Sequence, residues 1–374
     1  MIKRFYELNN FIKQQKVLII YGPRRAGKTT LLKHFLNSTE LKYRLDSGDN
    51  IKIQQVLSSQ DFSSILDYAS GYDLIAIDEA QEILNIGMGL KILIDQMEEL
   101  VVIATGSSSF ELSQKLGEPL TGRKKTLILY PLAQMELYPL YNKYELKEKL
   151  EEFLIFGSYP EVITAKDRKE KIDILQELSE SYLLKDVLTL DRIRSSRQLI
   201  ELLKLISFQV GSEVSLNELA SQVKIDVKTV GRYLDILEKA FVIKKLGGFS
   251  RNLHKEVVSK GKYYFLDNGI RNAVISQYNR IEDRNDTGQL FENFIIMERI
   301  KANHYKNIPV MYYFWRTYDG QEIDLVEERD GKLFAFEFKW SEKKKKKIPP
   351  DWERAYPQTE YEIINRDNYP EFIL

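Results

Sequence analysis

Short apolar runs alternate with amphipathic stretches over the first third of the chain. Residues 17–20 are apolar without interruption, which is typical of a short strand buried on both faces. Apolar residues then recur at helical spacing within 31–36, and further apolar runs lie within 73–78 and 101–104. This alternation predicts an α/β fold in which helices cover a parallel sheet.

The remaining segments of this region complete the pattern. We expect a strand over residues 41–46, one or two helices over 50–69 and a helix over 90–100. Residues 1–16 are amphipathic and predict a helix before the first strand.

A glycine-rich segment joins the first strand to the first helix. It reads GPRRAGKTT and has the pattern G-x-x-x-x-G-K-T in the strand–helix context that a P-loop requires. Lys28 would reach the β- and γ-phosphates of ATP, and the Thr29 hydroxyl would bind Mg²⁺. A turn that binds nothing is the alternative, which the flanking elements disfavour. The predicted ATP-binding residues are Gly22, Pro23, Arg24, Arg25, Ala26, Gly27, Lys28, Thr29 and Thr30.

Two acidic residues end the apolar run at 73–78. The sequence DLIAIDEAQ places Asp78 at the end of a strand, where its carboxylate would help to hold Mg²⁺ beside Thr29. Glu79 follows directly and would polarise the attacking water as a general base. A strand that merely ends in acidic residues is the alternative, and the preceding P-loop makes it a poor one.

Two further segments carry candidate ATPase residues. Thr105 or Ser107 would sense the γ-phosphate if the strand at 101–104 lies between the two motif-bearing strands; a helix N-cap explains Ser107 equally well. Arg123 precedes another predicted strand and would act as an arginine finger on a neighbouring subunit, which implies a homo-oligomer. A solvated basic turn is the alternative for Arg123.

Several motifs together resemble a known family. The segments GPRRAGKTT, LIAIDEAQ, ATGSSSF, LTGRKKTLILYPLAQMEL and FGSYPEVI are similar to those of prokaryotic AAA-type ATPases that carry a C-terminal domain of unknown function. The resemblance extends over the whole chain and implies an AAA-like core at 1–143, a helical lid at 144–193, a winged helix at 194–280 and a nuclease-like domain at 281–374.

The predicted winged helix has a local excess of positive charge. A capping-box-like start at Ser215 opens one short helix, and residues 228–240 form a second with Lys228, Thr229 and Arg232 on its exposed side. Residues 224–262 hold ten Lys and Arg against four Asp and Glu, a local charge of +6. This excess favours contact with the DNA backbone, although winged helices also bind proteins.

The C-terminal part contains a second chemical pattern. We expect strands within 310–316, 322–327 and 332–340 after a helix that begins near residue 288. Asp324 and Glu337 would bind Mg²⁺, Lys339 would position water, and Glu292 would join them from the helix. This arrangement resembles the PD-(D/E)xK nuclease pattern; a retained scaffold without nuclease activity is the alternative.

Composition narrows the classes of function. The chain of 374 residues has no cysteine, which excludes disulfides and thiolate chemistry, and its three histidines are scattered. Lys and Arg number 55, as do Asp and Glu, so a nucleic-acid surface has to be local. No apolar run approaches the length of a membrane span, and we expect a cytoplasmic protein.

Two functions fit these observations. In the first, ATP hydrolysis is coupled to DNA binding and to Mg²⁺-dependent DNA cleavage. In the second, the nucleotide state controls binding of a protein partner, and the nuclease-like domain is inactive.

Overall fold

The structure is a computed structural model that describes residues 2–107, 119–182, 196–250, 260–341 and 347–374. Its contacts group residues 3–131 with 239–241 as one compact unit, and 132–238 with 242–374 as a second. Three sequence-based expectations fall partly or wholly outside the described residues: the helix that Ser107 would cap, the end of the lid and the loop of the wing.

The first unit contains a five-stranded parallel sheet. Its strands are β1 (Val17–Tyr21), β2 (Tyr43–Ser47), β3 (Leu74–Asp78), β4 (Val101–Gly106) and β5 (Lys124–Ile128). The spatial order is β2-β3-β4-β1-β5. The predicted α/β fold with a parallel sheet is confirmed, and β4 separates the P-loop strand β1 from β3.

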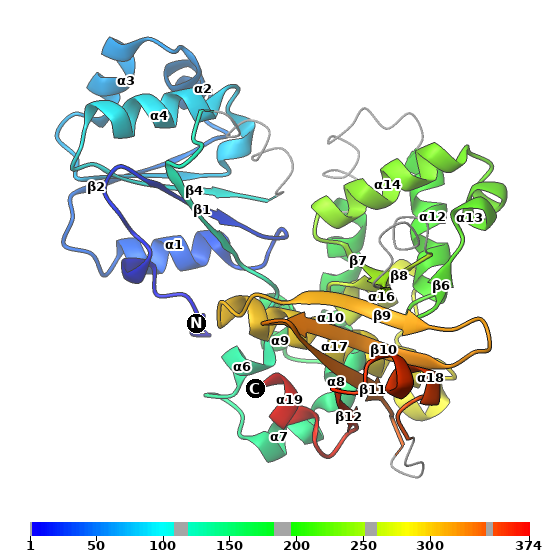
Figure 1. Cartoon of the computed structure of the whole chain (residues 1–374). Helices are drawn as coiled ribbons and strands as arrows, with labels where there is room; N and C mark the ends of the chain where they lie inside the picture. The colour runs from blue at the N-terminus through cyan, green and yellow to red at the C-terminus, as the bar shows by residue number, and fades with distance from the viewer. Residues whose placement is uncertain (1, 108–118, 183–195, 251–259, 342–346) are drawn as a thin grey trace. The chain divides into compact units, whose positions relative to one another are not determined.

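Helices cover both faces of this sheet (Figure 1). Helix α1 (Lys28–Leu36) lies on one face, and α2 (Ile51–Ser58), α3 (Phe62–Ala69) and α4 (Ile86–Gln96) lie on the other. Apolar side chains of α2, α3 and α4 pack against β1, β3 and β4 in one buried cluster. Burial of this apolar surface is the main force that holds the layers together.

The N-terminal segment differs from the predicted helix. Within residues 2–16 only the short 3₁₀ turn η1 (Leu8–Asn10) is helical. Arg4 is buried, and its guanidinium donates hydrogen bonds to the carbonyls of Ala26 at 2.5 Å and Tyr130 at 2.6 Å. Because these bonds tie the segment to the P-loop and to the residue two positions beyond β5, tertiary contacts outweigh the local helical pattern.

The second unit begins with short helices. These are α6 (Gln134–Leu137), α7 (Lys143–Glu148), α8 (Leu150–Phe156), α9 (Pro160–Thr164), α10 (Arg168–Glu177) and the π-helical turn η3 (Leu178–Tyr182). A turn at Gly157 separates two of these helices, because α8 ends at Phe156 and Pro160 begins α9.

The segment that the sequence predicts to be a winged helix contains three helices. They are α12 (Ser196–Phe208), α13 (Leu216–Val223) and α14 (Val227–Lys239), and the Ser215 hydroxyl caps α13 by accepting from the Glu218 N–H at 3.4 Å. The strands β6 (Glu213–Val214), β7 (Ile243–Gly248) and β8 (Gly261–Phe265) accompany them, followed by α16 (Asn268–Val274) and the turn η4 (Ile281–Asp283).

The C-terminal segment adds four strands to the same sheet. They are β9 (Met311–Arg316), β10 (Glu322–Arg329), β11 (Lys332–Phe338) and β12 (Glu360–Ile364), and the order is β12-β11-β10-β9-β7-β8-β6. Strand β7 pairs in parallel with β9 at Gly247 and Gly248. Strands β6, β7 and β8 therefore form one continuous sheet with the four strands of the C-terminal segment.

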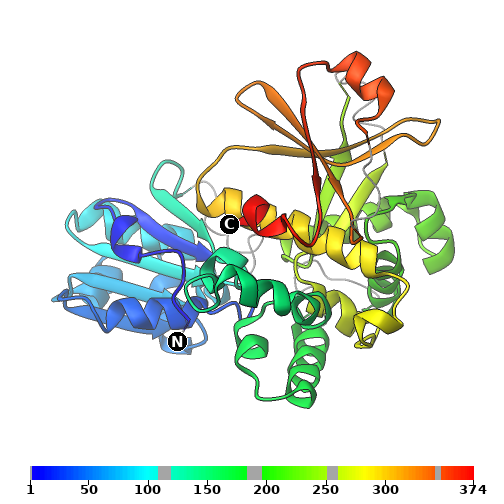
Figure 2. The ribbon, with the colours of Figure 1, turned by 90° about the horizontal axis from the view of Figure 1, so that it is seen from below.

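Helix α17 (Thr287–Tyr305) crosses one face of this sheet (Figure 2, yellow). Arg299 of α17 binds the buried Glu327 of β10 through two hydrogen bonds of 2.7 and 3.0 Å, which fixes the helix against the strand. The short helices α18 (Pro350–Ala355) and α19 (Tyr369–Ile373) complete the unit.

Candidate functional site

The P-loop connects the end of β1 to the first turn of α1. Gly22 has a φ of 153°, and a side chain there would place Cβ 2.0 Å from the carbonyl oxygen of Leu129. Gly27 precedes α1 with a φ of 96°, in the left-handed region that glycine adopts at little cost. Both glycines of the pattern are thus required by the path of the backbone.

Lys28 folds back over the loop. Its side chain is buried, and its Nζ donates to the carbonyl oxygens of Gly22 at 2.9 Å and Pro23 at 3.0 Å. The ammonium group therefore lies within the curve of the loop, where phosphate oxygens bind in a P-loop.

Asp78 connects the P-loop to the neighbouring strand. Its Oδ2 accepts from the Thr29 hydroxyl at 2.8 Å, and its Oδ1 accepts from the Thr105 hydroxyl. The three side chains come from the start of α1, the end of β3 and the end of β4. The structure therefore brings together the predicted Mg²⁺ ligands and one of the two predicted sensor residues.

Glu79 lies next to this cluster. Its backbone N–H donates to the Thr105 hydroxyl at 3.2 Å, and its φ of 50° is unusual for a residue with a side chain. The Gln81 amide donates to the Glu79 carboxylate at 2.5 Å and to the Ser107 hydroxyl at 3.3 Å. Thr105 and Ser107 are thus both linked to Glu79, and Gln81 is a contact that the sequence pattern did not reveal.

Arg123 lies at the amino ends of the strands, at the end of the parallel sheet opposite the P-loop. It directly precedes β5, whose first residue Lys124 pairs with Val17 at the start of β1. Its Nε forms an ion pair with Asp95 Oδ1 at 2.8 Å, and both side chains are partly exposed. Because the P-loop follows the carboxyl end of β1, Arg123 is remote from the nucleotide site of its own chain.

The exposed side of α14 carries basic residues. Lys228 and Arg232 are exposed and Thr229 is half-buried, whereas Val230, Leu234 and Leu237 are buried, as the sequence predicts. The Thr229 N–H and hydroxyl both bind the Asp226 carboxylate, at 2.8 and 2.5 Å, at the start of the helix. The bonds to Asp226 give α14 a fixed N-terminus.

The second predicted site gathers residues from α17, β10 and β11. Leu325 pairs with Phe336 across antiparallel strands, so Asp324 lies opposite Glu337. The Phe338 N–H donates to Asp324 Oδ2 at 2.8 Å, and Glu337 forms an ion pair with Lys339 at 2.6 Å. Asp324 and Glu337 are therefore cross-strand neighbours.

Three residues that the sequence pattern did not reveal join this site. The Tyr264 hydroxyl donates to Glu292 Oε1 at 2.6 Å. The Lys262 ammonium lies 2.5 Å from Glu322 Oε1 and 3.8 Å from Glu292 Oε1. Glu322 lies two positions before Asp324 on β10, but the register of β10 against β9 shifts between Ile323 and Val326, so simple alternation along the strand does not relate the two side chains.

The acidic groups of this site perturb one another. Burial, followed by the charges of Glu292 and Glu337, raises the pKa of Asp324 to about 8. Burial also raises the pKa of Glu292, against the opposing charge of Lys262. Burial disfavours the Lys262 ammonium, but the charges of Glu292, Glu322 and Asp324 outweigh it and raise the pKa of Lys262. The site thus brings together the carboxyl groups of Glu292, Glu322, Asp324 and Glu337 with the ammonium groups of Lys262 and Lys339.

The carboxylate oxygens of this site can bind a divalent cation. Asp324 and Glu337 offer oxygen ligands, which Mg²⁺ prefers. Burial is the main cause of the raised pKa of Asp324, and a cation would offset the smaller contribution from the charges of Glu292 and Glu337. Within the described ranges, no three His, Cys, Asp or Glu side chains are grouped so as to hold a metal ion. Two carboxylates would therefore share a cation with water or phosphate oxygens, as is usual for Mg²⁺.

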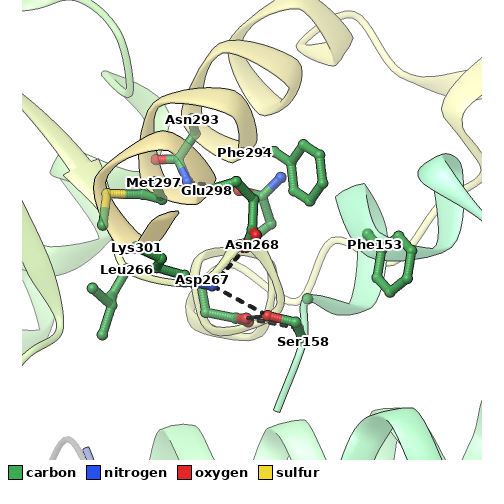
Figure 3. A pocket seen from close by; sticks show the side chains of 11 residues that line it. Phe153, Ser158, Leu266, Asp267, Asn268, Asn293, Phe294, Met297, Glu298 and Lys301 are labelled. Atoms are coloured by element: carbon green, nitrogen blue, oxygen red, sulfur yellow. Dashed lines mark hydrogen bonds and ion pairs between the residues drawn. The ribbon is translucent and has the colours of Figure 1, made fainter. Parts of the chain in front are cut away.

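The turn at Gly157 forms a separate buried polar cluster (Figure 3). Asp267 accepts from the backbone N–H of Ser158 at 2.7 Å, and Lys301 forms an ion pair with Glu298 at 2.7 Å. A side chain at Gly157 would place Cβ 1.8 Å from Asp267 Oδ1. These polar groups line a small cavity and bind one another. We interpret their contacts as structural, because they hold parts of the second unit together.

Family models match consecutive parts of the chain. One described as "AAA domain" matches residues 14–138, and two described as "Domain of unknown function" match 147–281 (DUF8612) and 287–368 (DUF4143). The first match covers every predicted nucleotide-binding residue. The first unit therefore has the fold and the motifs of an AAA-type P-loop ATPase, whereas the match at 287–368 leaves the nuclease-like interpretation a proposal.

Similar chains occur in archaea and bacteria. An uncharacterised protein of Methanocaldococcus jannaschii is 24% identical, over 94% of this chain and 81% of its own length. An uncharacterised protein of Mycobacterium tuberculosis is 25% identical, over 89% and 72%.

Solved structures match with low scores. A signal transduction ATPase with a tetratricopeptide repeat sensor from Pyrococcus horikoshii has a TM-score of 0.29 and 15% identity, and the match covers 76% of this chain and 43% of that one. AMPPCP-bound DnaA from Aquifex aeolicus has a TM-score of 0.28 and 18% identity, over 63% and 84%. In the described part of the present chain, no helix is both long and apolar enough to span a membrane.

Proposed function

We propose that this protein binds and hydrolyses ATP with Mg²⁺ and couples the nucleotide cycle to DNA binding in the cytoplasm, where ATP and chromosomal DNA are both present. The observation that supports ATP hydrolysis is the position of Asp78, whose two carboxylate oxygens bind Thr29 and Thr105. A hydroxyl and a carboxylate oxygen 2.8 Å apart at a P-loop are the donors that a hard cation takes.

Each predicted residue has a distinct task in this proposal. Lys28 binds the β- and γ-phosphates, and Thr29 and Asp78 hold Mg²⁺, which neutralises charge on the phosphates when bound. Glu79 accepts the proton of the attacking water. Thr105 contacts both Asp78 and the backbone of Glu79, so it is placed to couple the metal side of the site to the general base.

DNA binding is assigned to the exposed basic side of α14. Lys228 and Arg232 are four positions apart and therefore share one face of the helix. Such a face suits phosphate contacts. The competing function is a nucleotide-controlled switch that binds a protein partner through the same helix.

Filter binding of DNA against salt concentration separates the two functions. We expect affinity to fall by about 10²-fold or more between about 50 mM and about 200 mM salt, as release of counterions by about four phosphate contacts requires. The double variant Lys228→Ala/Arg232→Ala reduces both affinity and salt dependence, whereas Lys169→Ala, an exposed lysine of α10, is the matched control. Weak binding at every salt concentration would favour the protein-binding switch.

A second activity is supported by the C-terminal site. Asp324 and Glu337 face each other across β10 and β11, Glu292 approaches from α17, and Lys339 is bound to Glu337. We propose that these residues cleave DNA: the two carboxylates hold Mg²⁺, which supplies a Lewis acid for phosphodiester hydrolysis, and Lys339 positions water.

Asp324→Ala provides the test of this activity. It is expected to remove Mg²⁺-dependent cleavage of DNA while ATP hydrolysis continues at the wild-type rate, because the P-loop lies in the other compact unit. Cleavage is measured on single-stranded, duplex and branched DNA, with EDTA as the control. A wild-type protein that cuts none of these forms would make the domain a binding scaffold.

A further inference from the structure

The nuclease-like site extends across the sheet into the winged-helix segment. Lys262 of β8 pairs with Leu246 of β7, and two residues further along β7 Gly248 pairs with Phe314 of β9. Because alternate residues of a strand share a face, Lys262, Gly248 and Phe314 lie on one face of the sheet. Gly248 has no side chain, so no side chain at this position separates Lys262 from Phe314 on this face.

The Lys262 ammonium ends among the carboxylates of the site. It lies over the Phe314 ring, 5.3 Å from its centre, and its two nearest carboxylates are Glu322 at 2.5 Å and Glu292 at 3.8 Å. The side chain is only 1% exposed. A lysine that is this deeply buried is held by its charge partners, because an unpaired ammonium would be costly there.

Two lysines divide the negative charge of the site between them. Lys339, whose side chain is 35% exposed, forms an ion pair with Glu337. The buried Lys262 forms ion pairs with Glu292 and Glu322. Asp324 interacts with charges from both pairs, namely those of Glu337 on one side and of Glu292 and Lys262 on the other. A divalent cation near Asp324 would therefore be repelled by an ammonium group that the protein already supplies.

We propose that Lys262 is the resident cation of the nuclease-like site: it holds Glu292 and Glu322 together when no metal ion is bound, and its charge opposes the binding of a divalent cation at the neighbouring Asp324. This inference rests on the proposed metal site at Asp324 and Glu337. It makes the winged-helix strand β8 part of that site, so a displacement of β8 would alter the affinity of the site for metal.

A thermal-shift titration with Mn²⁺ tests the proposal. The measurement uses the full chain with the Lys28→Ala substitution and no nucleotide, so that the P-loop does not contribute. Lys262→Met is expected to melt at a lower temperature than this parent without metal. Mn²⁺ should then raise its melting temperature more, with a half-saturating concentration at least about tenfold lower, because a like charge has been removed from close range.

Three variants serve as controls. Lys262→Arg keeps the charge and is expected to respond to Mn²⁺ as the parent does. Lys245→Met removes an exposed lysine of β7, outside the carboxylate cluster, and is also expected to behave as the parent. Asp324→Ala added to Lys262→Met should abolish the stronger response to Mn²⁺.

If Lys262→Met folds only with Mn²⁺, its circular dichroism signal should be lost on adding EDTA.

The outcomes separate this inference from the proposed nuclease activity. An equal Mn²⁺ response of Lys262→Met and the parent, or a variant that stays unfolded with and without Mn²⁺, would overturn the role of Lys262. Stronger Mn²⁺ binding by Lys262→Met, together with no cleavage by the wild type, would support Lys262 as the resident cation and remove only the nuclease activity.

Discussion

Glu79→Gln is expected to bind ATP with nearly wild-type affinity and to hydrolyse it about 10²-fold to 10⁴-fold more slowly, the range that a positioned general base contributes. The amide keeps the shape of the carboxylate but cannot accept the proton of the attacking water. Binding is measured with a fluorescent ATP analogue, and turnover is measured as release of inorganic phosphate in the presence of Mg²⁺.

Lys28→Ala is the contrasting variant. It removes the ammonium group that lies over the carbonyls of Gly22 and Pro23, so both ATP binding and hydrolysis should be lost. Equal hydrolysis by Glu79→Gln and the wild type would remove Glu79 from the role of base. Normal ATP binding by Lys28→Ala would remove the P-loop interpretation itself.

Arg123→Ala is expected to lower turnover by about 10³-fold or more while ATP affinity stays nearly unchanged, because a finger stabilises charge that develops in the transition state. Asp95→Asn is the matched control: it breaks the ion pair with Arg123 but leaves the guanidinium in place. If Arg123→Ala loses activity and Asp95→Asn does not, Arg123 has a role in the reaction and not only in the local structure.

The same variant tests the expectation of a homo-oligomer. Arg123→Ala mixed with Glu79→Gln should regain part of the activity, since a mixed interface pairs an intact Glu79 with an intact Arg123. Normal hydrolysis by Arg123→Ala would make Arg123 a solvated basic residue, and the reason to expect an oligomer would disappear.

Local patterns were sufficient to predict the nucleotide site. The apolar runs at β1, β3 and β4 specify buried strands, and in a parallel sheet the ends of such strands meet at one edge. Thr29, Asp78 and Thr105 each follow directly from such a strand or from the P-loop pattern. The sequence pattern did not predict the contacts of Gln81, because this residue lies in a turn, where no periodicity indicates which way a side chain points.

The C-terminal site was predictable only in part. Asp324 and Glu337 lie on strands whose pairing follows from a short hairpin, and Glu292 lies on a long helix. Lys262 and Tyr264 come from a strand that the sequence assigns to a wing, and no local signal shows that β7 pairs with β9. Pairing between strands distant in sequence depends on the packing of the whole unit.

The N-terminal segment shows the limit of periodicity. Its amphipathic pattern predicts a helix, yet Arg4 binds the carbonyls of Ala26 and Tyr130. Hydrogen bonds to such distant partners leave no trace in a local pattern. A buried guanidinium needs these acceptors, and this requirement decides the path of the chain.

The central claim is that the nucleotide state alters DNA binding, and the most direct measurement is the Kd for DNA of Glu79→Gln with saturating ATP and with saturating ADP. Filter binding at one fixed salt concentration gives both values, and because this variant does not turn ATP over, the ATP state persists. Coupling between the two sites predicts Kd values that differ by about fivefold or more. Equal Kd values in the two nucleotide states would contradict the account.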